Sequence, residues 1–111
     1  MNLASIVFDC RDAATVARFW AGALECPIGE DASPAYAVVS SNPAWMFLAV
    51  PEAKVVKNRV HVDLEAADLE AEVERLVALG ATRLADHDEG GTRWVTLSDV
   101  EGNEFDVASG A

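Results

Sequence analysis

Apolar residues recur with two different periods along this 111-residue chain, and the periods separate predicted helices from predicted strands. Helical spacing begins near Asp12 in one stretch and near Asp68 in another, and aspartate is a favourable residue at a helix N-cap. The second stretch ends at Gly80, which is a typical C-terminal capping residue. We therefore predict two amphipathic helices. Their predicted apolar faces are Val16, Phe19, Trp20, Ala23 and Leu24 in the first, and Leu69, Val73, Leu76, Val77 and Leu79 in the second.

Short strand-like runs flank both predicted helices, and turn-forming Gly, Pro, Asn and Ser separate them. One run precedes each helix, at residues 5–9 and 59–63. The runs that follow the helices are residues 35–39, 45–50, 82–85, 93–97 and 104–107. Between residues 26 and 35 the pattern is weak, so a strand in that segment is the least defined of the set.

The two halves of the chain repeat the same order of elements. Asp9 and Asp63 each close an opening strand, which gives a period of about 54 residues. One half is too small to bury its own apolar face, so the halves are expected to share one structure. The pattern predicts an α+β fold with two βαβββ modules in a single domain, residues 1–111. Module one spans about 1–50, a proline-led linker about 51–58, and module two about 59–111.

The composition describes a globular, acidic chain. It has 51% hydrophobic residues, 19 acidic against 8 basic residues, and a net charge of −11. Without a basic cluster, this charge argues against nucleic-acid and anionic-membrane partners. It favours a neutral or cationic small molecule, although acidity also serves solubility. Neither a signal peptide nor a transmembrane run is visible, and Cys10 and Cys26 are expected as reduced thiols, so the predicted location is cytoplasmic.

Four segments of the sequence resemble the vicinal oxygen chelate superfamily, and most closely its small glyoxalase-like and bleomycin-resistance-like members. They are residues 17–20, 57–64, 74–81 and 97–105. The resemblance implies a curved mixed sheet in which both modules surround a small-molecule cavity, with the helices on the outer face, often in a homodimer. The sequence departs from the pattern at Val100, where the family usually has proline, and at Glu25, where glycine is common.

The resemblance also implies a metal site, because enzymes of this superfamily take one ligand from the first and one from the last strand of each module. His61 and Glu104 match the two positions of module two. In module one, Val7 stands at the position expected to match His61, and residues 44–50 hold no ligand side chain. Two of the four ligands are therefore missing, and a divalent metal (Zn, Ni, Mn or Fe) is only a candidate cofactor. Carboxylates considered as a third ligand are Asp9, Asp63 and Asp106.

Strand alternation predicts a polar and aromatic face for ligand binding. The residues assigned to ligand binding are Arg59, His61, Trp45, Phe47, Trp94, Glu104 and Asp106. Three interpretations of His61 and Glu104 stay open at this point: ligand binding without metal, metal binding, or a polar cluster in which Glu104 pairs with His61 or Arg59. Trp20 is expected in the core, and His87 in a solvated loop.

The sequence thus favours a small-molecule-binding protein of the glyoxalase and bleomycin-resistance type, with an unidentified organic ligand. The alternative is a metal-dependent lyase, isomerase or dioxygenase that uses His61 and Glu104. A third interpretation is a scaffold that acts through protein partners.

Overall fold

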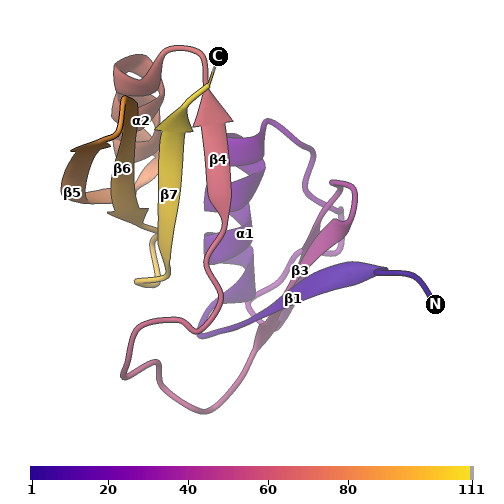
Figure 1. Cartoon of the computed structure of the whole chain (residues 1–111). Helices are drawn as coiled ribbons and strands as arrows, with labels where there is room; N and C mark the ends of the chain where they lie inside the picture. Colours follow the sequence, from indigo (N-terminus) through magenta and orange to yellow (C-terminus); the bar gives the residue numbers. More distant parts are fainter. Residues whose placement is uncertain (111) are drawn as a thin grey trace. The chain divides into compact units, whose positions relative to one another are not determined.

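The computed structural model describes residues 1–110 and forms two compact units, Met1–Val55 and Val56–Ala111. The boundary falls inside the segment predicted as a linker. Each unit contains one mixed sheet and one helix, as the ribbon in Figure 1 shows. The predicted α+β class is confirmed.

The first unit has a three-stranded sheet in the order β1-β3-β2. Its elements are β1 (Ser5–Cys10), α1 (Ala13–Leu24), β2 (Tyr36–Val39) and β3 (Ala44–Ala49). β1 runs parallel to β3, and β2 runs antiparallel to it. The fourth strand of a βαβββ module is reduced to a single bridge between Ile28 and Val39. The segment that carries Ile28 also holds Pro27 and Pro34, which lack the N–H group that a ladder needs.

The ends of α1 follow from local chemistry. The Asp12 carboxylate accepts a hydrogen bond from the Thr15 N–H, as predicted for an N-cap. Glu25 ends the helix in the left-handed conformation, with φ of 54°. Glycine adopts this conformation without a steric cost, which explains why it is common at this position in the family.

The second unit has a four-stranded sheet in the order β4-β7-β6-β5. Its elements are β4 (Asp63–Ala66), α2 (Leu69–Leu79), β5 (Thr82–Glu89), β6 (Thr92–Ser98) and β7 (Glu104–Ser109). β4 is parallel to β7, whereas β5, β6 and β7 are joined as antiparallel neighbours. This is the predicted βαβββ module, and Asp68 and Gly80 cap α2 as expected.

The opening strand of this unit begins later than predicted. The sequence pattern indicates a strand over residues 59–63, but β4 begins at Asp63 and ends at Ala66. The first residue pair of the β4–β7 ladder is Asp63 with Asp106, and β4 therefore begins at Asp63. The preceding segment follows β7 without a strand ladder, held by single hydrogen bonds such as Asp106 N–H to the Val62 carbonyl.

The late start of β4 changes the number of residues that separates equivalent positions in the two modules. The helix caps Asp12 and Asp68 are 56 residues apart, and so are the last residues of the opening strands, Cys10 and Ala66. The position equivalent to His61 is therefore Ser5, and not Val7.

The apolar face of α2 is narrower than predicted. Leu69, Val73 and Leu76 are buried, but Val77 and Leu79 are 44% and 40% exposed. The helix contacts the sheet through one stripe, and the two exposed residues lie outside it.

Exposed ion pairs connect the start of α2 to the β5–β6 hairpin. The Arg83 guanidinium donates to both oxygens of Glu70 and to Asp86, and Arg93 also donates to Glu70. The hydrogen bonds from Arg83 hold the pKa values of both carboxyl groups below their ordinary values of 4.5 and 3.8. The same carboxylates hold the pKa of Arg83 above its usual range.

Lowered carboxyl pKa values make this contribution to stability depend on pH. It is present above the ordinary values of 4.5 for Glu70 and 3.8 for Asp86, and it is lost as the pH falls through the lower folded values. We expect Arg83→Ala to lower the urea midpoint slightly at pH 7 and by less at pH 2. Arg75→Ala, which removes a pair within α2, is the matched control. An Arg83 effect of equal size at both pH values would contradict this prediction.

Two further observations bear on location. Neither Cys10 nor Cys26 forms a disulfide bond, and Cys10 is buried. Over residues 1–110, neither helix has the length and apolar character that a bilayer crossing requires.

Candidate functional site

One face of the second sheet is apolar and packs under α2, and the other is polar. Val95, Leu97, Phe105 and Val107 are buried on the apolar face. Because side chains alternate along a strand, their neighbours Thr96 and Asp106 lie on the opposite side. We call this opposite side the polar face and define it by Asp63, Thr96, Asp106, Trp94 and His87.

Strand register aligns the polar groups in a row across this face. Asp63 of β4 lies beside Asp106 of β7, and Asp106 lies opposite Thr96 of β6. The Thr96 hydroxyl donates to Asp106 Oδ1 at 2.5 Å, and His87 Nε2 lies 3.3 Å from the same hydroxyl oxygen. The His87 ring also stacks on Trp94, with ring centroids 4.7 Å apart. The row thus orients Asp106 from the β5–β6 side.

His61 completes the row from the segment before β4. Its Nε2 atom lies 3.5 Å from Asp63 Oδ1 and 3.6 Å from Asp106 Oδ2. The His61 side chain is 46% exposed and that of Asp106 is 23% exposed. The imidazole therefore stands between two carboxylates at the surface of the unit.

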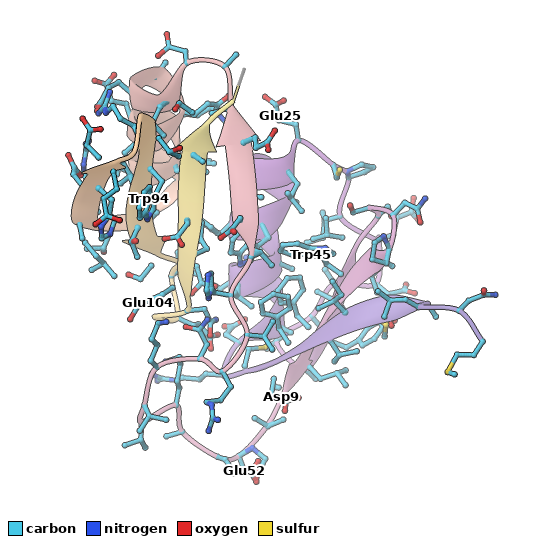
Figure 2. All side chains as sticks on the ribbon, in the orientation of Figure 1. Asp9, Glu25, Trp45, Glu52, Trp94 and Glu104 are labelled. Atoms are coloured by element: carbon cyan, nitrogen blue, oxygen red, sulfur yellow. The ribbon has the colours of Figure 1, made fainter. Side chains whose placement is uncertain are left out.

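Asn58 holds this preceding segment against β7. Its side-chain amide accepts a hydrogen bond from the Glu104 N–H at 2.7 Å and donates to the Glu104 carbonyl at 3.1 Å. It also donates to the Val60 carbonyl. One amide side chain thus makes the hydrogen bonds that a neighbouring strand would make. It holds the backbone at Val60 and at Glu104. The side chain of Glu104 lies at the start of β7 in Figure 2.

A pocket of about 90 Å³ opens beside these groups. Its lining residues are Lys57, His61, Thr96, Glu104, Phe105 and Asp106. Ligand pockets for drug-sized molecules are typically several hundred Å³. A pocket of this volume therefore accommodates an ion with a few waters, or the polar end of a larger molecule.

The structure brings together His61, Glu104 and Asp106, three of the predicted site residues, as lining residues of this pocket. The expected polar cluster differs in its partners, however. His61 faces Asp63 and Asp106, and among the described residues no hydrogen bond or ion pair joins Glu104 to His61 or to Arg59. Arg59 is exposed and does not line the pocket.

The assignment of Trp45 and Phe47 to a ligand-binding face is wrong. Both are buried, at 7% and 0% exposure, on the side of β3 that packs against α1. The ring centroids of Trp45 and Trp20 are 5.0 Å apart, and those of Phe47 and Phe8 are 5.1 Å apart. They form the core of the first unit, and Trp20 is in that core as predicted.

His87 also differs from its prediction. It lies within β5 and not in a solvated loop, where it stacks on Trp94 and approaches Thr96. Trp94 is half-buried on the polar face, as its alternation predicts, although it does not line the pocket.

Sequence reasoning missed three contributors to the site. Lys57 and Asn58 lie in the predicted linker, about 51–58, and at the start of the segment that resembles the family, and Thr96 lies in a predicted strand. The sequence assigns none of the three to the site. The signal available for Thr96 was its alternation with the buried Val95 and Leu97. The hydrogen bonds of Asn58 reach Glu104, 46 residues later, so no short segment of the sequence predicts them.

Comparison with known proteins identifies the family. The sequence profile of the glyoxalase-like domain matches residues 5–108, nearly the whole chain. The chain belongs to the glyoxalase-like domain family. The glyoxalase-like resemblance expected from the sequence is thereby confirmed. No curated protein sequence matches the chain.

Solved structures share the glyoxalase fold. A glyoxalase/bleomycin resistance protein/dioxygenase family enzyme from Burkholderia phytofirmans has a TM-score of 0.80 at 17% identity, covering 98% of both chains. The fosfomycin resistance protein FosX from Mesorhizobium loti has a TM-score of 0.76 at 15% identity, covering 99% of this chain and 92% of that one. A mutant FosX from Listeria monocytogenes, complexed with Mn(II) and 1S,2S-dihydroxypropylphosphonic acid, has a TM-score of 0.79 at 12% identity, covering 99% and 90%. At these identities the likeness establishes the fold.

The four-ligand metal arrangement of glyoxalase-like enzymes does not fit this chain. The corrected offset puts Ser5 at the position equivalent to His61, and Ala44, its partner in the register of β1 and β3, at the position equivalent to Glu104. Alanine has no donor atom, and a serine hydroxyl is not a usual ligand for these metals. The first module therefore supplies no ligand of the expected kind.

Proposed function

We propose that this glyoxalase-like domain protein binds a small organic molecule at the polar face of its second unit. The observation that carries the proposal is the pocket beside His61 and Asp106, where carboxylate, imidazole, hydroxyl and ammonium groups converge. Convergent polar groups in a concave site are typical of ligand recognition.

The charges around the pocket favour a particular kind of ligand. Glu104 and Asp106 line the pocket and Asp63 flanks it, against the single ammonium group of Lys57. Because carboxylates accept hydrogen bonds, a head group with N–H donors or a positive charge is the best match. The pocket volume fits that head group alone, and the Trp94 side chain on the same face offers an apolar surface to the rest of the ligand.

This proposal predicts a specific loss of binding. We expect a thermal-shift screen of aromatic amines and cationic antibiotics, run in EDTA, to give a hit that Asp106→Asn weakens at least about tenfold, because one charge-assisted hydrogen bond is lost. Calorimetric titration measures the dissociation constant. Asp88→Asn, at an exposed aspartate of β5, is the matched control and should change it less than twofold. Hits that are indifferent to Asp106→Asn would place the ligand elsewhere.

A second candidate function is the metal-dependent lyase, isomerase or dioxygenase using His61 and Glu104. It is favoured by one observation, that both side chains line the same pocket. A mutant FosX from Listeria monocytogenes was solved in complex with Mn(II), which supports this candidate. Titration of the full chain with Co²⁺ tests this candidate. His61→Ala and Glu104→Gln should each abolish stoichiometric binding, and binding that is unchanged in both variants would exclude it.

The proposal includes a homodimer and a cytoplasmic location. The first sheet supports the dimer, because Val7 and Leu48 are 47% and 36% exposed on the face away from α1, beside Tyr36. Exposed apolar groups of this kind are typical of protein–protein contacts. The absence of a disulfide between Cys10 and Cys26 supports a reducing compartment.

A further inference from the structure

The pocket is smaller than the organic ligand that the proposed function requires. Its volume is about 90 Å³, whereas sites for drug-sized molecules occupy several hundred Å³. Most of its lining residues belong to β6 and β7, which pair with each other in the sheet: Thr96, Glu104, Phe105 and Asp106. The other two, Lys57 and His61, belong to the segment that precedes β4. A change in the volume of the pocket therefore depends on this segment.

We call residues 56–62 the pocket segment. It contains no helix or strand residue, and it lies in the second unit. From Val56 to His61 every residue except Asn58 is exposed, and Val56 and Val60 are 71% and 78% exposed. Because apolar side chains stabilise a structure by leaving water, packing contributes little to holding this stretch in place.

Asn58 is the residue that fastens the pocket segment to β7. Its side-chain amide donates to the Glu104 carbonyl at 3.1 Å and accepts from the Glu104 N–H at 2.7 Å. A third hydrogen bond, from Asn58 Nδ2 to the Val60 carbonyl at 2.7 Å, ties Asn58 to the peptide group that leads into His61. One side chain thus connects the segment both to the sheet and to itself.

The position of Asn58 links its contacts to both pocket residues of the segment. Lys57 precedes it directly, and His61 follows three residues later. Segments with few buried apolar contacts and with exposed hydrogen bonds are those that open while the rest of a protein stays folded. Release of Asn58 from Glu104 would therefore free both lining residues without unfolding the sheet.

We propose that the pocket segment is a movable wall of the ligand site, and that Asn58 is the positioning residue that holds it closed. The proposal rests on the proposed function, which gives the wall a ligand to admit. With Asn58 bound to Glu104, the pocket accepts a polar head group alone. When Asn58 is released, Lys57 and His61 move away from β7, and the pocket widens for a larger molecule.

Two amide hydrogens of β7 report whether the wall is closed. The Glu104 N–H donates to the Asn58 side chain, and the Asp106 N–H donates to the Val62 carbonyl at 3.1 Å. Both acceptors lie in the pocket segment. Both amides should therefore exchange with solvent when the segment opens, even while β6 and β7 stay paired.

Hydrogen exchange of the full chain, measured by NMR without ligand at low urea concentrations, tests the proposal. In the wild type we expect both amides to exchange at least about tenfold faster than those of the β6–β7 ladder, with little dependence on urea, because the opening exposes little surface. Asn58→Ala should speed exchange of the Asp106 amide about tenfold, although its own acceptor at Val62 is intact.

Asn58→Asp and Val60→Ala are the comparison variants. The aspartate keeps an acceptor for the Glu104 N–H and loses both donated hydrogen bonds, so it should speed Asp106 exchange by only about threefold. Val60→Ala changes an exposed side chain of the same segment and should alter this exchange by less than about twofold. Amides of the β6–β7 ladder should stay within about twofold in all variants, because the sheet remains folded.

Two results would overturn the movable wall. One is a wild-type Asp106 amide that exchanges only through global unfolding, with the urea dependence of the slowest amides of the sheet. The other is Asn58→Ala with unchanged Asp106 exchange. Neither result touches the organic-ligand proposal, which depends on the thermal-shift screen. A screen without hits, with exchange as expected, would overturn the ligand proposal and support the motion.

Discussion

Replacing Phe47 with alanine is expected to lower the free energy of unfolding by about 3–5 kcal/mol. Phe47 is fully buried and packs against Phe8, in the cluster that also contains Trp45 and Trp20. The expected loss combines the burial of the aromatic ring with the cavity that its removal leaves. Urea denaturation followed by tryptophan fluorescence measures it.

Met46→Ala is the matched control, because Met46 is half-buried on the opposite face of the same strand. We expect that variant to lose less than about half as much stability. Since Phe47→Ala can remove most of the stability of a small protein, Phe47→Leu provides a milder test of the same site. A Phe47→Ala variant that is as stable as the wild type would show that this ring is not part of the core.

Asp99→Ala is expected to destabilise the protein by about 2–4 kcal/mol. The Asp99 side chain is 4% exposed, and its carboxylate accepts hydrogen bonds from the backbone N–H groups of Glu101 and Asn103 and from the Asn103 side chain. Hydrogen bonds to a charged group contribute about 1.5–3 kcal/mol, and alanine leaves these donors without an acceptor. Thermal and urea unfolding measure the loss.

Asp99→Asn separates the backbone contacts from the charge. The asparagine carbonyl can still accept from both backbone N–H groups, so we expect less than about half of the alanine effect. Because Glu104 follows this turn directly, the alanine variant should also weaken ligand or metal binding, and the asparagine variant should not. Equal losses in the two variants would mean that the charge of Asp99, and not the turn, carries the effect.

Asp99 also explains why part of the family pattern is visible in the sequence. Residues 97–105 resemble the family because the turn requires a carboxylate at Asp99, and Gly102 adopts φ of 85°. Both requirements are local, within a few residues of one another. Val100 replaces the usual proline here without preventing the turn.

The helices and the second module were predictable for a similar reason. Asp12, Asp68 and Gly80 act on backbone groups within one turn of the helix, and the period of the apolar residues is a local property. The β5, β6 and β7 strands were also found, although β5 extends four residues further than predicted, to Glu89.

The faces of β3 were not predictable from alternation. This strand, Ala44–Ala49, is apolar at every position, so a period of two does not distinguish its sides. The position of α1 decides which side of the strand becomes the core. The helix packs against the side that carries Trp45 and Phe47, and both rings are buried. The prediction for Trp45 and Phe47 failed for that reason.

The candidate site likewise has features that the sequence predicts and features that only the tertiary structure decides. The sequence by itself determined the family, the α+β class and both helices, because periodicity, caps and turn motifs depend on neighbours along the chain. It also predicted His61, Glu104 and Asp106 as site residues. Only the tertiary structure decided that His61 faces Asp63 and Asp106, that Thr96 and His87 support Asp106, and that Asn58 holds Glu104. These contacts join strands through register, and register depends on burying one face of a sheet, which no short segment encodes.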